Sequence, residues 1–68
     1  MENKAKLNKI LSILDTMFVN EITLANAVES VDNLRRSPVA YDKVITINNA
    51  IVDLETMVRA ELAREDEV

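Results

Sequence analysis

The segment Arg35-Arg36-Ser37-Pro38 decides how this chain folds. Proline is well tolerated at the first position of a helix, serine is a strong N-cap in front of it, and the residue before a proline avoids helical geometry. The segment therefore predicts that one helix ends near Arg35 and that another begins at Pro38. The charges agree, because the two arginines would lie at the negative end of the first helix and Asp42 near the positive start of the second.

Apolar residues after this segment recur at alternating steps of four and three, which places them along one stripe of a helix. The spacing predicts a helix over residues 38 to about 64. A strand over residues 44–47 is the competing interpretation, because their side chains have high strand propensity, but nothing nearby resembles a hairpin turn. The stripe consists of Ala40, Val44, Ile47, Ile51, Leu54 and Val58.

The first half of the chain keeps the same rhythm, with Glu21 in one slot of the stripe, and predicts a helix over about residues 4–35. Asn20 is also a suitable N-cap, with Val19 and Leu24 placed around it as a hydrophobic staple, so a break near residues 16–20 stays open. The choice lies between an antiparallel helical hairpin and a three-helix bundle. The stripe of this half consists of Leu7, Ile10, Leu14, Met17, Leu24, Val28 and Val31.

The composition favours an all-α fold. Hydrophobic residues make up 49% of the chain, with Phe18 and Tyr41 as the aromatic residues, and glycine is absent. Strand-rich domains of this size depend on glycine for tight turns, whereas glycine destabilises a helix interior by about 1 kcal/mol. We therefore expect one helical domain over residues 1–68, with residues 65–68 as a short acidic tail.

The charges at the two ends of the chain favour the antiparallel hairpin. A reversal at Ser37 brings the first residues beside the last ones, where opposite charges would face each other. Both charge clusters oppose the dipoles of their own helices, so they are favourable only if they meet across the hairpin. The basic residues are Lys4, Lys6 and Lys9, and the acidic ones are Glu61, Glu65, Asp66 and Glu67.

A hairpin of 68 residues needs a supplement to its core, because two helices alone cannot enclose one. The chain has no cysteine and no histidine, which excludes disulfides and the common metal and haem sites and leaves self-association. We therefore expect a homodimer that forms a four-helix bundle. The candidate self-association residues are Leu7, Ile10, Leu14, Met17, Phe18, Leu24, Val28, Val31, Val44, Ile47, Ile51, Leu54 and Val58.

Residues that carry out chemistry are largely missing, so we expect no enzymatic activity, no cofactor and no metal site. There is no histidine base, no cysteine nucleophile and no glycine-rich phosphate loop. The acid pairs Glu29 with Asp32 and Glu61 with Glu65 are typical of a solvated helix face rather than of a cation site. The net charge of −4 argues against direct binding of nucleic acid. No apolar run is long enough to span a bilayer, and residues 1–9 do not resemble a signal peptide, so we expect a cytoplasmic location.

The sequence points to a binding function with a protein partner of unknown identity. Arg35, Arg36 and Tyr41 are of the types that dominate binding hot spots, although turn chemistry alone also explains them. Glu29 and Asp32 are the candidate residues of a second idea, an acidic mimic of nucleic acid, because residues 15–32 hold four acids and no base. The leading hypothesis is a regulator, adaptor or inhibitor, and the alternative is an assembly component that acts by self-oligomerisation.

Three polar residues lie in or beside the apolar stripes, and two interpretations of them stay open. Asn48, Glu21 and Glu55 are either exposed at the edge of a stripe or buried at polar contacts that fix partner and register, as a core asparagine does in coiled coils.

Overall fold

The computed structural model describes residues 2–66, and nearly all of them are helical. The elements are α1 (Glu2–Glu29), α2 (Asp32–Arg35) and α3 (Pro38–Asp66), with no strand among the described residues. The predicted all-α class is confirmed. The helix after Pro38 runs past the predicted end at Arg64 to Asp66, and Glu67 and Val68 of the predicted acidic tail lie outside the described residues.

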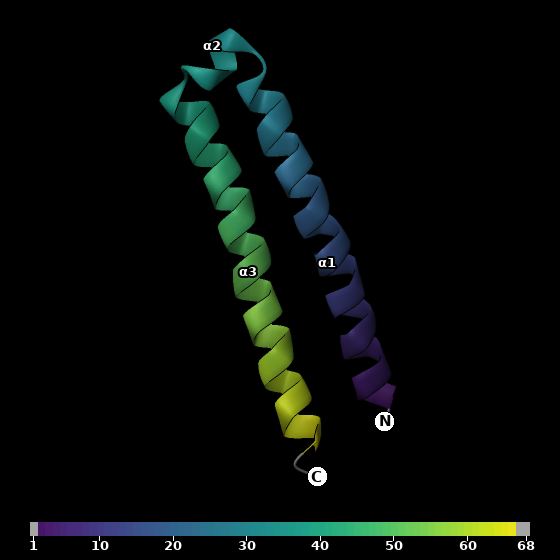
Figure 1. The fold of residues 1–68 in the computed structure, drawn as a ribbon. Helices are drawn as coiled ribbons and strands as arrows, with labels where there is room; N and C mark the ends of the chain where they lie inside the picture. Colours follow the sequence, from purple (N-terminus) through teal and green to yellow (C-terminus); the bar gives the residue numbers. More distant parts are fainter. Residues whose placement is uncertain (1, 67–68) are drawn as a thin grey trace.

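The two long helices form an antiparallel hairpin. They lie side by side, with the single-turn helix α2 across one end and both termini at the other (Figure 1). The open end is held by a hydrogen bond in which Nδ2 of Asn3 donates to Oε1 of Glu65 over 3.2 Å. A third helix, α2, is present, but it has four residues and adds no third long helix to the pair.

The break considered near residues 16–20 is absent, since α1 is helical throughout that stretch. Threonine disfavours helix partly because its hydroxyl competes for backbone partners. Here the competition is resolved within the helix: the Thr16 hydroxyl donates to the Ser12 carbonyl over 3.2 Å, and the Thr23 hydroxyl donates to the Val19 carbonyl over 3.4 Å. Asn20 is therefore an exposed helical residue and not an N-cap.

The first helix ends at Glu29, earlier than the predicted end near Arg35. The Ser30 hydroxyl donates to the Ala27 carbonyl over 2.6 Å, which occupies an acceptor of the last helical turn. Val31 follows with extended dihedral angles, φ −104° and ψ 113°, and its carbonyl then accepts from the amides of Leu34 and Arg35. The reversal thus consists of one extended residue and one turn of helix. None of the described residues has a positive φ, so the turn needs no glycine.

The start of α3 is as predicted. The Ser37 hydroxyl accepts a hydrogen bond from the amide of Ala40 over 3.2 Å, the geometry of an N-cap, and Pro38 is the first helical residue. This local motif fixes where the second long helix begins.

The hydrophobic core is small. Leu14, Ile51 and Val58 are the buried hydrophobic side chains, each at most 5% exposed, and Leu7 and Leu11 pack against them. The contact between α1 and α3 continues along a seam of buried or half-buried residues. The seam comprises Leu7, Leu11, Leu14, Glu21, Ala25 and Val28 of α1, and Val44, Asn48, Ile51, Glu55, Val58 and Leu62 of α3.

Only part of each predicted stripe lies in this seam. The seam residues follow alternating steps of four and three, with position 18 skipped on α1. The predicted stripe began from Leu7 with a step of three instead, so Leu11 and Ala25 take the inward positions that the prediction gave to Ile10 and Leu24. Most of the displaced residues are exposed on one flank of the hairpin: Ile10, Met17 and Leu24 of α1, and Ile47 and Leu54 of α3. Val31, the last residue of the predicted first stripe, is exposed in the turn.

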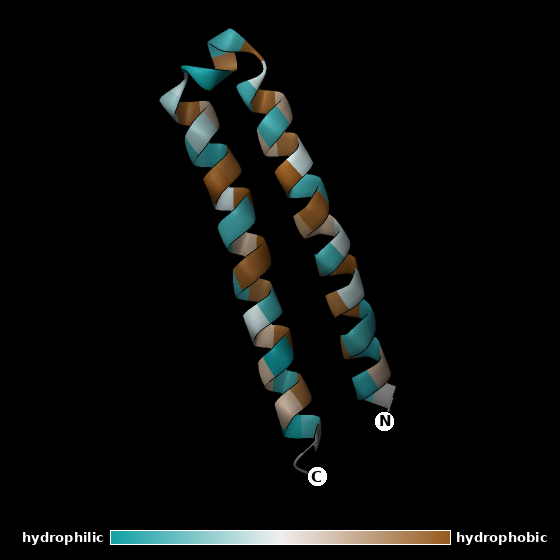
Figure 2. Ribbon diagram, in the orientation of Figure 1, coloured by the Kyte–Doolittle hydropathy of each residue, from teal (hydrophilic) through white to brown (hydrophobic). Residues whose placement is uncertain are grey.

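The hairpin is elongated and exposes much apolar surface. Its radius of gyration is 15.6 Å and its extents are 52 × 16 × 10 Å, whereas a compact chain of this length is expected near 11 Å. Its accessible surface is 5403 Å², compared with about 4,300 Å² for a typical folded monomer of this mass. Hydrophobic residues occur along the full length of both long helices (Figure 2).

Loss of the Ser37 cap should destabilise the hairpin measurably. We expect Ser37→Ala to lower the free energy of unfolding by about 1 kcal/mol, because the Ala40 amide loses its acceptor. Urea unfolding followed by circular dichroism at a fixed protein concentration measures the change. Ser12→Ala is the control: this exposed residue lies inside α1, where alanine is the better helix former. Equal stability of Ser37→Ala and the wild type would contradict the capping role.

Candidate functional site

The most prominent surface feature is exposed hydrophobic side chains. Sixteen large ones are exposed among the described residues, against three that are buried. Scattered single hydrophobic residues are normal on a protein surface, but contiguous patches mark interaction sites.

One flank of the seam forms an apolar face. Met17, Leu24 and Ile47 line a shallow hollow of about 330 Å³ together with the seam residue Ile51. Residues seven positions apart lie on the same side of a helix, so they extend this surface along each helix. Residues three positions further on widen the surface. The apolar face is defined by Ile10, Ile13, Met17 and Leu24 of α1 and by Ile47, Leu54 and Met57 of α3, all of them exposed.

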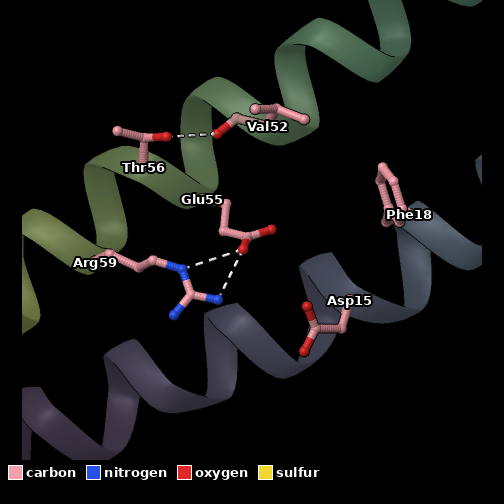
Figure 3. A pocket seen from close by; sticks show the side chains of 6 residues that line it. All are labelled: Asp15, Phe18, Val52, Glu55, Thr56 and Arg59. Atoms are coloured by element: carbon pink, nitrogen blue, oxygen red, sulfur yellow. Dashed lines mark hydrogen bonds and ion pairs between the residues drawn. The ribbon is translucent and has the colours of Figure 1, made fainter.

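The other flank is a mixed face. Successive residues of a helix lie about 100° apart, so Phe18 flanks the seam on the side opposite to Met17. A second hollow of about 340 Å³ lies there, between α1 and α3 (Figure 3). Its lining defines the mixed face and consists of Asp15, Phe18, Val52, Glu55, Thr56 and Arg59.

An ion pair organises the mixed face. Arg59 donates from both Nε and Nη2 to Oε1 of Glu55, over 3.1 and 2.8 Å, one helical turn apart on α3. The Asp15 carboxylate faces the same hollow from α1, and the Phe18 ring lies next to it (Figure 3). Sequence reasoning did not identify this group as a site. The spacing of Glu55 and Arg59 signals their pairing, but the approach of Asp15 depends on the hairpin register.

The turn brings part of the predicted partner-binding group together. Glu29, Arg35 and Tyr41 line a small hollow of about 120 Å³ at the closed end of the hairpin, with apolar walls from Leu34 and Val44. The Tyr41 ring is exposed. Charged and aromatic side chains around an apolar depression are a combination found at binding hot spots. We call these three residues and Leu34 the turn end.

The other two predicted residues have different surroundings. Asp32 accepts a hydrogen bond from Nη2 of Arg35 over 2.8 Å, three residues along α2, so its charge is partly balanced within the turn. Arg36 is exposed and does not line the hollow. The four acids of residues 15–32 therefore do not share one surface, since Glu21 is buried in the seam and Asp32 is paired with an arginine.

Two polar side chains interrupt the seam. Glu21 is only 8% exposed, and it has no hydrogen bond or ion pair within the part of the chain that the structure describes. Asn48 is half-buried, and its Oδ1 atom is buried without a hydrogen-bond partner. Of the two interpretations left open by the sequence, exposure at the edge of a stripe is wrong for both residues. Glu55 lies at the rim of the seam, where it binds Arg59.

Neither a metal centre nor a membrane span emerges from residues 2–66. No group of three acidic, histidine or cysteine side chains in this range is arranged to hold a metal ion. No helix in the same range combines the length and the apolarity needed to cross a bilayer.

Comparison with protein-family models, curated proteins and solved structures finds no match to the chain. The surfaces are therefore assigned from its own residues.

Replacing Glu21 by an apolar residue should stabilise the chain. We expect Glu21→Leu to raise the free energy of unfolding by about 1–3 kcal/mol, because it places an apolar side chain at a position that is only 8% exposed and extends the core between Leu14 and Val28. Chemical denaturation measures the change. Asp15→Leu is the control, since this exposed acid should shift stability by no more than about 0.5 kcal/mol. A less stable Glu21→Leu variant would indicate that the carboxyl group has a stabilising contact.

Proposed function

We propose that this chain is a small, non-catalytic protein–protein interaction module that binds a larger protein and modulates it as a regulator, adaptor or inhibitor. The observation that supports the proposal is the surplus of exposed hydrophobic side chains over buried ones. A chain with three buried hydrophobic residues has little interior in which to build a reaction site, but it offers long apolar surfaces for recognition.

The mechanism is steric occupation of a surface on the larger protein. Apolar side chains supply affinity, and the charges around them supply selectivity and orientation. The turn end suits this role best, because Arg35, Glu29 and the exposed Tyr41 ring surround an apolar depression at the tip of an elongated molecule. The proposal places the module and its target in the cytoplasm.

The second candidate function is an assembly component whose own oligomer is the active form. It is favoured by the exposure of hydrophobic residues on both flanks of the seam, such as Leu54 on the apolar face and Val52 on the mixed face. Two self-associating faces on opposite sides of the hairpin permit growth beyond a dimer. A single such face is used up once two copies have paired. The mass in solution over a hundredfold range of concentration distinguishes the two.

Mimicry of nucleic acid is the weakest candidate, because it needs negative charge gathered on one face. Glu21 is buried and Asp32 is paired with Arg35, so neither contributes much to such a negative face. Under this idea, replacing Glu29 and Asp32 by lysine abolishes inhibition of a nucleic-acid-binding target, so unchanged inhibition would remove it.

The role of the turn end is tested by affinity capture from a lysate of the cells in which this chain is naturally produced. We expect a larger protein to be retained by the wild type and by Val39→Ala, and to bind Tyr41→Ala at least about tenfold more weakly. Val39 and Tyr41 are 65% and 63% exposed at the same end of α3, and Val39 does not line the turn-end hollow. Titration of the purified partner measures the two affinities.

Two outcomes would contradict the proposal. Retention of the same protein with equal affinity by Tyr41→Ala would exclude the turn end as the contact. Turnover in a highly purified sample, lost on a single acid-to-amide substitution, would overturn the non-catalytic assignment.

A further inference from the structure

We infer that a second copy of this chain covers the apolar face, so that two hairpins form a closed homodimer of four long helices. The inference goes beyond the proposed function and does not depend on it. The turn end and the mixed face stay on the outside of such a dimer and remain open to a larger protein.

The first argument is area. The accessible surface of 5403 Å² exceeds that of a typical folded monomer of this mass by roughly 1,100 Å². A standard protein–protein interface buries about 800 Å² on each partner. The broad side of the hairpin measures 52 × 16 Å, a rectangle of roughly 800 Å². A contact over the whole broad side therefore reaches the size of a standard interface, and it extends along the hairpin beyond the apolar face itself.

The second argument is charge. The residues that define the apolar face are all uncharged, and Glu21 is the one ionisable side chain that lines its hollow. Each copy carries a net charge of −4, so an arbitrary contact between two copies tends to bring like charges together. Pairing through the mixed face would gather Asp15 and Glu55 of both copies in one interface. Pairing through the apolar face avoids this repulsion.

The third argument is shape. The hollow between Met17, Leu24 and Ile47 has apolar walls from both helices. Such a depression accepts an apolar side chain from a facing helix, as in the knobs-into-holes packing of helical bundles. Leu54 lies one heptad beyond Ile47 and is exposed on the same face, which makes it a suitable knob. The surface thus carries both a hole and a knob, the two features that pairing with a second copy under two-fold symmetry requires.

The buried Glu21 does not oppose this contact. Its side chain lines the floor of the hollow, but it is already only 8% exposed within one hairpin. Covering the hollow therefore removes little further accessible surface from this side chain.

The experiment uses two pairs of variants matched in exposure. Leu54 and Val52 are 44% and 45% exposed, two residues apart on α3, on the apolar and mixed faces respectively. Leu24 and Ile22 form the equivalent pair on α1, where Ile22 lies one turn beyond Phe18 of the mixed face. Each residue is replaced by lysine in the full chain. The mass in solution is measured by light scattering behind size exclusion over a hundredfold range of concentration, and helix content by circular dichroism.

We expect the wild type, Val52→Lys and Ile22→Lys to have twice the 7.7 kDa chain mass. Leu54→Lys and Leu24→Lys should raise the dissociation constant of the dimer by at least about a hundredfold, because pairing would bury two unpaired charges. Loss of helix in these two variants alone would also support the inference. Within one hairpin the paired positions are equally exposed, so only an intermolecular contact distinguishes them.

Three results would overturn the inference: a wild-type monomer up to millimolar concentration, a wild-type mass that grows past the dimer, or equal loss of dimer in the variants of both faces. Only the purified chain is used, so the result stands apart from the search for a larger partner.

Discussion

The structure depends on one geometric constraint: two helices share a single seam. Each helix of a pair can direct one narrow stripe at its neighbour, and the rest of its circumference meets solvent. In this chain the seam takes residues at alternating steps of four and three, which leaves Met17 and Ile47 on one flank and Phe18 and Val52 on the other. The small core, the elongated shape and the two exposed faces all follow from this division.

The turn decides what those faces contain. Reversal without glycine requires an extended residue and a single helical turn, and Ser37 then fixes the start of α3. These local contacts set the register of the two long helices. The register in turn places Tyr41 beside Glu29 at the closed end and brings Asp15 to the hollow of Glu55 and Arg59. A hydrogen bond at residue 37 therefore influences a surface cluster several helical turns away.

The features that the sequence predicted well are local ones. The cap at Ser37 and the start at Pro38 are encoded in adjacent residues, and so is the meeting of Arg35 with Tyr41 around the turn. Which residues enter the seam is not encoded locally. Three residues after Leu7 and Leu14 come Ile10 and Met17, and four residues after them come Leu11 and Phe18. Both flanks are therefore apolar, and periodicity alone does not decide which of them packs inward. Packing across the hairpin makes that choice, and it also determines the surroundings of Asp15.

The polar residues of the seam connect the fold with its surfaces. Glu21 and Asn48 occupy positions where leucine would add buried area, and the Oδ1 atom of Asn48 is left without a partner. Each such group costs stability when it is desolvated. A hairpin with three buried hydrophobic side chains has little stability to lose. Any partner that covers an exposed face stabilises the folded state by mass action, so folding and association of this chain are linked. Because the seam buries so little, association through an outer face adds to the stability of the fold. The apolar face, whose defining residues are all uncharged, is the face best suited to that contact.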